Sequence, residues 1–257
     1  MDYSKLSPEE KKAYLKMLEM RHRKEDEYSR WLTTGFPKTN TLKKLILGLL
    51  GLPYERRARP IQHPIVISSF ISAFVGIFIA ARSQGLELVL TEYGFIGPQF
   101  YRHYFLTIIT SFFLHGSWMH LLGNSYYFLV FGDDVEDEMK FFEFIRFLFW
   151  GHVCGLGLHS IMTGFNSLPL VGASAGVSAL LGFYMIRFPK RQITYMLFIF
   201  YFWIHLPAFG VFIWKFGWEY MVATSGVKTQ VAHWAHLGGA AWGVWVALTQ
   251  RKRRLKN

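Results

Sequence analysis

Cysteine is almost absent from this chain, because Cys154 is the only one among 257 residues. One cysteine excludes an intramolecular disulfide and leaves the redox compartment open. No HExxH motif occurs, and no carboxylate follows His233-x-x-His236, so these histidines do not predict a metalloprotease. Internal repeats and low-complexity segments are absent as well. We therefore predict a protein without a metal or another cofactor.

Acidic residues are outnumbered by basic ones, 17 against 28, which gives a formal net charge of +11. Such a surplus is compatible with nucleic-acid binding, but the basic residues gather between apolar segments. If the N-terminus is cytoplasmic and the chain has six spans, every cluster lies on the cytoplasmic side, which is the positive-inside asymmetry. Attraction to anionic lipid headgroups is sufficient to explain the clusters. We expect a lipid bilayer as partner and no nucleic acid. The clusters contain Arg21, Arg23, Lys24, Lys43, Lys44, Arg56, Arg57, Arg59, Lys190, Arg191 and the run 251–256.

Hydrophobic residues make up 52% of the chain and are unevenly distributed. They collect in six segments near the ~20 residues that are needed to cross a ~30 Å hydrocarbon layer. The stretch Tyr104–Leu114 is apolar but shorter, which indicates a re-entrant or interfacial element. The predicted fold class is all-α, a polytopic membrane protein with a six-transmembrane-helix bundle. The six segments are Pro64–Arg82, Trp118–Asp133, Phe141–Met162, Val171–Phe188, Ile193–Trp214 and Val231–Gln250.

The parts of the chain outside these segments differ from them in composition. Residues 1–60 are basic and contain a capping box that begins at Ser7, so we expect a helical cytoplasmic extension. A short helix after Asn40 suits either the membrane surface or a small soluble helical pair. Residues 61–250 form the predicted membrane domain, and residues 251–257 a basic cytoplasmic tail. The acidic turn, residues 133–138, is interpreted as a solvated helix end.

Three polar groups interrupt the apolar segments. They are His120 with Asn124 in the second segment, Ser174 in the fourth and His236 in the sixth. A bilayer core penalises every unpaired polar group, so such residues usually have partners or a task. The set contains a nucleophile, a base and donors for an oxyanion, which are the components of acyl transfer. An intramembrane serine hydrolase is therefore the leading hypothesis.

The predicted topology brings these groups to a similar depth. The second, fourth and sixth segments all begin on the outer side, and each polar group lies near the start of its segment. Gly239-x3-Gly243 is a packing signature of helices in lipid, and His236 falls on the same helix face. Tight packing against the fourth segment would bring His236 to the ~3 Å from Ser174 that activates a nucleophile.

These positions suggest roles. Ser174 is the predicted nucleophile, and His236 is the general base that later protonates the leaving amine. Asn124 and His120, one turn apart, are expected to stabilise the oxyanion, with the backbone N–H of Ser174 as a third donor. No aspartate within the spans is available to orient the histidine, which predicts a dyad. His233 is the competing base, but it lies nearer the loop and lacks the glycine face.

The order and spacing of three motifs resemble the rhomboid family of intramembrane serine proteases. The motifs are His120-Leu-Leu-Gly-Asn124, Gly172-Ala-Ser174-Ala-Gly176 and Ala235-His236-Leu-Gly-Gly239. The resemblance covers about residues 64–250 and is continuous over residues 112–138.

This resemblance implies a six-helix core that opens to water from the outer side. It implies Ser174 and His236 as the dyad, with His120 and Asn124 at the oxyanion site and Gly172 beside them. The fifth span and the loop before the sixth would act as gate and cap. Substrates would be transmembrane proteins cleaved in or near their membrane-spanning helix.

Two positions depart from the family pattern. Members often carry a Trp-Arg pair in the first outer loop, upstream of the histidine that matches His115. Here residues 106–107 are Leu and Thr, and Tyr101-Arg102 lies further upstream. Some members stack an aromatic residue on the catalytic histidine, at the position where this chain has Ser178.

Other interpretations compete with the protease. Ser174 could be a small residue in a helix seam, and the chain could be a catalytically inactive rhomboid-like chaperone or binding protein. The presence of both Ser174 and His236 argues against the inactive form. A transporter would carry more charges within its spans. We expect a multi-pass protein of a bacterial inner (cell) membrane with both termini cytoplasmic, and make no prediction of its oligomeric state.

Overall fold

The computed structural model describes residues 7, 9, 54–55, 64–197, 202–227 and 229–254. The chain divides into two compact units, Met1–Leu52 and Pro53–Asn257, and every element with described bounds belongs to the second. The predicted helical extension, residues 1–60, therefore lies outside the described residues apart from positions 7, 9, 54 and 55. The domain boundaries stay a prediction.

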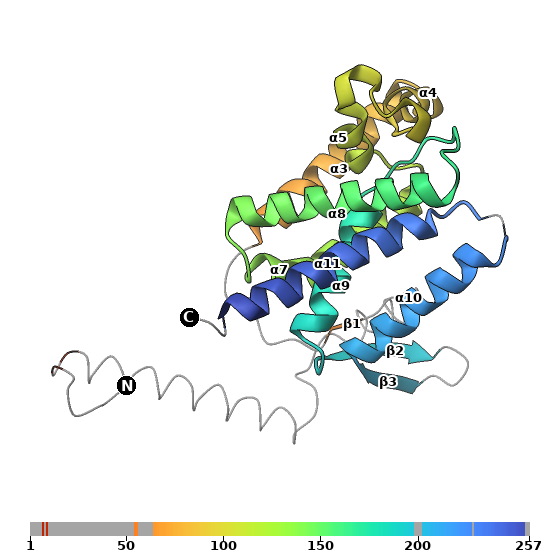
Figure 1. The fold of residues 1–257 in the computed structure, drawn as a ribbon. Coiled ribbons are helices and arrows are strands. Elements are labelled where there is room, and N and C mark those ends of the chain that lie inside the picture. Colours follow the sequence, from red (N-terminus) through yellow and green to blue (C-terminus); the bar gives the residue numbers. More distant parts are fainter. Residues whose placement is uncertain are drawn as a thin grey trace. The chain divides into compact units, whose positions relative to one another are not determined.

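Helices dominate the described part of the second unit (Figure 1), which confirms the helical fold class. The helices are α3 (Ile65–Ser83), α4 (Leu86–Tyr93), η2 (Gly97–Gln99), η3 (Arg102–Phe105), α5 (Leu106–Phe113), α6 (Trp118–Tyr127), the π-helix η4 (Phe128–Gly132), α7 (Asp133–Glu136), α8 (Phe141–Met162), α9 (Ser174–Arg187), α10 (Ala208–Thr224) and α11 (His233–Arg254). The strands are β1 (Tyr54–Glu55), β2 (Gln192–Leu197) and β3 (Phe202–Pro207).

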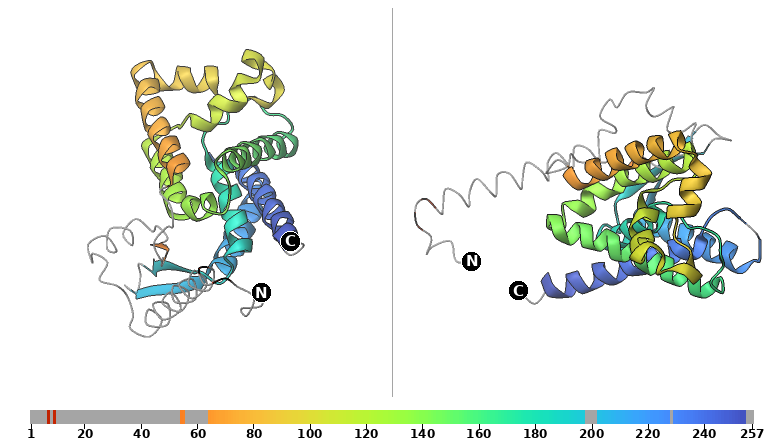
Figure 2. Two further views of the ribbon diagram at one scale, coloured as in Figure 1. Left: turned by 90° about the vertical axis from the view of Figure 1, so that its left-hand side faces the viewer. Right: turned by 90° about the horizontal axis from the view of Figure 1, so that it is seen from above.

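Helix α9 is the centre of the bundle. Every residue from Ala175 to Met185 is buried, so the helix has no face exposed to the surroundings. It packs against α8, α10 and α11 (Figures 1 and 2), as well as against the run from α6 to α7. A helix buried on all sides is apolar all round, and the alanines and glycines of α9 let its neighbours approach closely.

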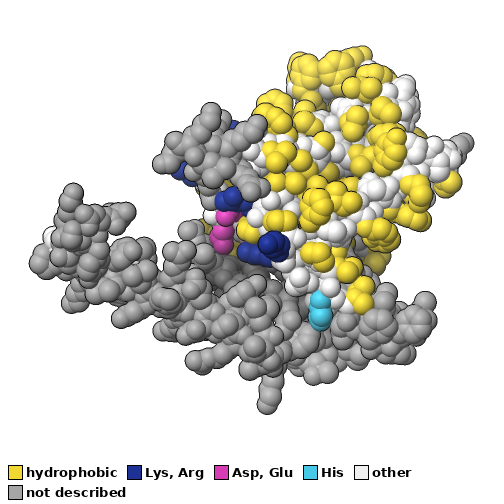
Figure 3. Space-filling view, turned by 60° about the horizontal axis from the view of Figure 1, so that its bottom comes forward, with side chains coloured by type: hydrophobic (Ala, Val, Ile, Leu, Met, Phe, Trp, Pro, Cys, Tyr) yellow, Lys and Arg dark blue, Asp and Glu magenta, His cyan; other side chains and the backbone are white. Residues whose placement is uncertain are grey.

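The surface of the described residues is that of a membrane protein. Helices α3 and α8 are each long and apolar enough to cross a bilayer, and the bent pair Arg102–Phe113 and Trp118–Glu136 passes the same test together. Figure 3 shows hydrophobic side chains spread over one face. Soluble proteins rarely expose such contiguous apolar surface, so this face contacts lipid. The six-span count stays a prediction. The large hydrophobic side chains that are exposed in the described residues include Ile65, Ile79, Leu122, Phe142, Ile161, Trp214 and Trp245.

The predicted fifth span, Ile193–Trp214, is wrong up to Pro207, where the strands of this region end. This region forms an antiparallel hairpin, in which Gln192 pairs with Pro207 and Leu197 with Phe202, and β1 adds a third strand beside β2. Hydropathy alone does not distinguish a short apolar strand from a helix, and this segment is rich in β-branched and aromatic residues. The helix of this region is α10, which begins directly after Pro207 and continues to Thr224. Proline is common at the start of helices.

The acidic turn is also not solvated, contrary to the interpretation from sequence. Asp134 is buried and pairs with Arg191, and Glu138 Oε2 accepts from Arg187 Nε at 2.6 Å. Both arginines lie at or just beyond the C-terminal end of α9. These ion pairs therefore connect α7 to the C-terminal end of α9, whereas Ser174 is at the N-terminal end.

Glu136, in the same turn, caps the beginning of α3. Its two carboxylate oxygens accept from the backbone N–H groups of Val66 at 2.9 Å and Ile67 at 3.1 Å. The N-cap residue, Pro64, makes no side-chain cap hydrogen bond. The carboxylate thus satisfies two N–H groups that have no acceptor within the helix, and its charge complements the helix dipole.

Glu136→Ala is expected to lower the free energy of unfolding by about 1–2 kcal/mol, the usual cost of losing a capping side chain. Thermal unfolding in detergent measures the change. Glu87→Ala is the matched control, because it removes an exposed carboxylate from the first turn of α4. We expect that control to change stability by less than about 0.5 kcal/mol. Equal unfolding midpoints for Glu136→Ala and the wild type would contradict the capping role.

Candidate active site

Ser174 is the first residue of α9, and the turn before it depends on Gly172. Gly172 has a φ of +115°, which residues with a side chain rarely adopt. Its N–H donates to the carbonyl of Ser111 at 2.8 Å, which fixes the turn against α5. The first N–H groups of α9 have no acceptor within the helix, so they can bind developing negative charge. Ser174 therefore lies beside ready donors.

His120 and Asn124 approach this turn from α6. The Ser117 hydroxyl begins α6 by accepting from the backbone N–H of His120 at 3.1 Å. A Cβ placed on Gly172 would lie 2.5 Å from His120 Nε2 and 3.5 Å from Asn124 Nδ2. Only glycine leaves room for both side chains. The structure thus brings together His120, Asn124 and Gly172.

Each of these two side chains offers a donor for which the described residues show no hydrogen-bond partner. Asn124 is 7% exposed, and its Nδ2 has no hydrogen-bond partner in the part of the chain that the structure describes. His120 Nδ1 accepts from the N–H of Gly116 at 3.5 Å, so a neutral ring carries its proton on Nε2, which is a ring atom next to Gly172. A buried donor without an acceptor, such as Asn124 Nδ2, is costly, and together with the half-buried His120 it is suited to an oxyanion.

His236 lies in the first turn of α11, which packs against α9 through glycine. A Cβ on Gly239 would overlap the carbonyl of Ala175, and Gly243 repeats this contact one turn later. The two backbones therefore approach as closely as sterics allow. This is the packing that the Gly239-x3-Gly243 motif predicts, and Ala175 directly follows Ser174 in the chain.

The sequence neighbours of Ser174 and His236 meet at one glycine of α8. Gly155 of α8 lies against both Ala175 and Ala235, which adjoin the two candidate residues in sequence. Within the described residues, no hydrogen bond joins the Ser174 hydroxyl to the imidazole of His236. Catalytic hydrogen bonds are often long before a substrate binds, so this geometry is compatible with a dyad.

Glu219 is a site residue that the sequence analysis missed. Its Oε1 accepts from His236 Nδ1 at 3.0 Å and from Lys215 Nζ at 2.8 Å, and its Oε2 is paired with His233 Nδ1. Glu219 is itself buried on α10. The prediction of a dyad considered only aspartate within the predicted spans, whereas the carboxylate that contacts His236 belongs to a glutamate beyond the predicted fifth span. Pro207 is the sequence feature that could have indicated Glu219, because a helix that begins after this proline includes Glu219 among its buried residues.

The same cluster provides the candidate metal ligands of the described region. Glu219, His233 and His236 each offer one ligand atom, and these atoms lie within 4.8 Å of one another. The carboxylate missing from the sequence motif thus comes from α10. However, the ammonium of Lys215 contacts the same carboxylate and opposes a further cation. We therefore interpret the cluster as a hydrogen-bonded network around the imidazole of His236.

The loop between α3 and α6 is anchored by Arg102. Its Nη2 donates to the carbonyls of Thr91 at 2.8 Å and Gly94 at 2.9 Å. Phe95 and Leu170 then form an isolated antiparallel bridge, which joins this loop to the one that leads into Ser174. Arg102 therefore ties the loop down in a chain that lacks the Trp-Arg pair.

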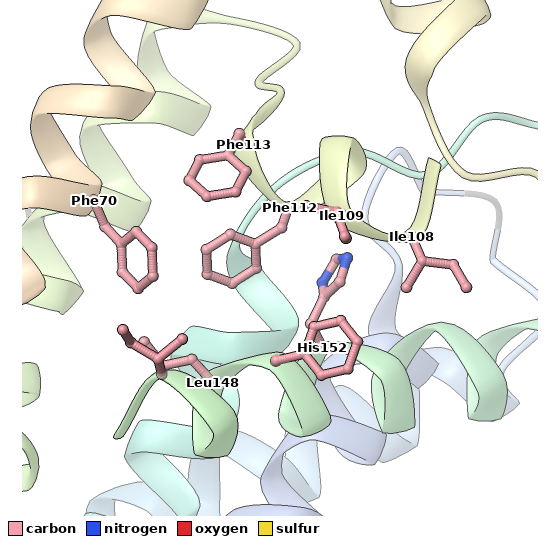
Figure 4. A pocket seen from close by; sticks show the side chains of 9 residues that line it. Phe70, Ile108, Ile109, Phe112, Phe113, Leu148 and His152 are labelled. Carbon is pink, nitrogen blue, oxygen red and sulfur yellow. The ribbon is translucent and has the colours of Figure 1, made fainter. Parts of the chain in front are cut away.

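An apolar cavity of about 190 Å³ lies behind the site, between α3, α5 and α8 (Figure 4). His152 lines it, and His152 Nε2 is 3.0 Å from the hydroxyl of Ser111, the residue whose carbonyl holds Gly172. His152 thus has a structural partner in Ser111. None of the candidate catalytic residues lines this cavity, so the cavity is separate from the candidate site. The lining residues are Phe70, Ile108, Ile109, Phe112, Phe113, Ile145, Leu148, Phe149 and His152.

Comparison with known proteins identifies the family of the chain. Residues 99–253 match the family model of the rhomboid domain, which is more than half of the chain and includes every candidate site residue. No curated protein matches the chain. Helix α3 and the first part of the following loop lie outside the matched region, although the resemblance of the motifs extends to about residue 64. The chain is an integral membrane protein and belongs to the rhomboid family.

Proposed function

We propose that this chain is an intramembrane serine endopeptidase that cleaves transmembrane protein substrates in or near their membrane-spanning helix. The observation that carries the proposal is that Asn124 Nδ2, a buried donor with no partner among the described residues, and His120 Nε2 both meet the turn that precedes Ser174. The contact of Gly239 with Ala175 supports a position of His236 at the same end of α9.

The proposed reaction begins when Ser174 Oγ attacks the scissile carbonyl carbon while His236 Nε2 accepts the hydroxyl proton. Asn124 Nδ2–H, His120 Nε2–H and the backbone N–H of Ser174 donate to the oxygen that becomes negative. Collapse of the tetrahedral intermediate breaks the C–N bond, and His236 delivers its proton to the leaving amine. Water then hydrolyses the acyl-enzyme by the same steps and restores the Ser174 hydroxyl.

The membrane arrangement is part of the proposal. Six spans with cytoplasmic termini, in a bacterial inner (cell) membrane, place all basic clusters on the cytoplasmic side. The start of α9 would then lie in the outer half of the bilayer, where water can reach the acyl-enzyme. Substrates would arrive from the surrounding lipid as single transmembrane helices.

A catalytically inactive rhomboid-like chaperone or binding protein is the alternative. Such a protein needs neither a hydroxyl nor an imidazole at the junction of α9 and α11. The buried Nδ2 of Asn124, which lacks an acceptor among the described residues, favours the enzyme, because a developing oxyanion would supply one.

Co-expression with model single-span substrates tests the function. We expect the wild type to produce cleaved fragments and Ser174→Ala to produce none. Ser178→Ala is the matched control, because it removes another serine of α9 that is buried one turn further along, and it should retain cleavage. Substrates left intact by the wild type, or cut equally by Ser174→Ala, would contradict the proposal.

A further inference from the structure

The buried carboxylate of Glu219 has no role in the dyad mechanism, although it contacts the general base. It lies on the face of α10 that is directed into the bundle, together with Ala208, Val211 and Phe212. Charged groups within membrane proteins are costly and commonly functional. The position of Glu219 therefore calls for an explanation beyond packing.

We propose that Glu219 is a positioning residue, whose carboxylate holds Nδ1–H of His236 and leaves Nε2 to take the proton of Ser174. The inference rests on the proposed protease function and converts the dyad into a Ser-His-Glu arrangement. Glu219 does not touch the reacting atoms, and it acts through the imidazole.

The tautomer of His236 carries the argument. An ionised carboxylate only accepts hydrogen bonds, so the 3.0 Å contact from His236 Nδ1 to Glu219 Oε1 requires the proton on Nδ1. A neutral imidazole then has its lone pair on Nε2, the nitrogen that a general base needs. The opposite tautomer would present an N–H to Ser174 and would be unable to accept its proton.

Neighbouring side chains balance the charge of the Glu219 carboxylate. Lys215 lies four residues before Glu219 on α10, and its Nζ donates to Oε1 at 2.8 Å. His233 Nδ1 is paired with Oε2, and His233 Nε2 is 2.9 Å from the hydroxyl of Thr229. Three partners thus hold the carboxylate, which limits its rotation and reduces the cost of burying its charge.

The test compares kcat and KM of the full-length chain in proteoliposomes, with a single-span model substrate. Glu219→Gln is expected to lower kcat roughly 10- to 100-fold with KM nearly unchanged, because the amide can donate to Nδ1 and stabilise the wrong tautomer. We expect this loss to be smaller than in soluble triads, since the packing of Gly239 also fixes the helix that carries the ring. Glu219→Asp should recover part of kcat. Glu92→Gln, a half-exposed carboxylate on α4, should not change it.

A double variant separates positioning from a structural role. If Glu219 acts only through the imidazole, Glu219→Gln should cause no further loss in a His236→Ala background. A wild-type kcat for Glu219→Gln, an effect on KM alone, or an additive loss in that background would overturn the inference. Failure of the proposed function is distinguishable, because the wild type would then cleave no better than Ser174→Ala. That outcome would overturn this inference as well.

Discussion

Replacing His236 with alanine is expected to lower the rate of substrate cleavage about 10⁵-fold or more, as much as Ser174→Ala, because nucleophile and base act as a unit. Without the imidazole, the Ser174 hydroxyl keeps its proton and is a weak nucleophile. The variant that carries both substitutions should be no slower than either single one. Single-turnover cleavage in proteoliposomes measures these rates without a contribution from product release.

His103→Ala is the control for this prediction. His103 takes part in a partly exposed ion pair with Glu92, outside the candidate site. Exposed pairs of this kind contribute about 0–1 kcal/mol, so the variant should cleave at close to the wild-type rate. Activity of His236→Ala within tenfold of the wild type would be inconsistent with its assignment as the base.

Gly239→Ala is expected to reduce cleavage more than about 10²-fold, although it adds a single methyl group, since a misplacement of about 1 Å can cost that much. The new Cβ would overlap the carbonyl of Ala175, a backbone atom that cannot rotate away. Helix α11 must then move off α9, which separates His236 from Ser174. We also expect a lower unfolding temperature, because overpacking destabilises by about 1–3 kcal/mol.

Two other glycines provide matched controls for Gly239. A Cβ on Gly123, between the two candidate oxyanion donors, or on Gly157 of α8 would meet no atom within 4 Å. Alanine at these positions should preserve cleavage and stabilise the helices slightly, by up to about 1 kcal/mol. Wild-type cleavage by folded Gly239→Ala would show that close contact between α9 and α11 is not required.

Local sequence features predicted the parts of this fold that depend on them. The bounds predicted for Phe141–Met162 match α8, and those for Pro64–Arg82 are within one residue of α3, because length and apolar content suffice to define a spanning helix. The spacing of Gly239 and Gly243 predicted the contact of α11 with α9, because small residues allow two helix backbones to approach closely.

Features that depend on tertiary partners could not be predicted in this way. The hairpin of β2 and β3 has the hydropathy of a span, and only the pairing of its strands distinguishes it. The acidic turn looked solvated because its arginine and helix-end partners are distant in sequence. Glu219 was missed for a similar reason: its relation to His236 exists only once α10 lies beside α11.

The identity of the nucleophile is the claim on which the mechanism depends. The direct measurement is treatment of the detergent-solubilised chain with a fluorophosphonate probe, followed by mass spectrometry of its peptides. We predict one adduct, on the peptide that contains Ser174, which is lost in Ser174→Ala and reduced in His236→Ala. An adduct on another serine, or labelling that persists in Ser174→Ala, would contradict the account.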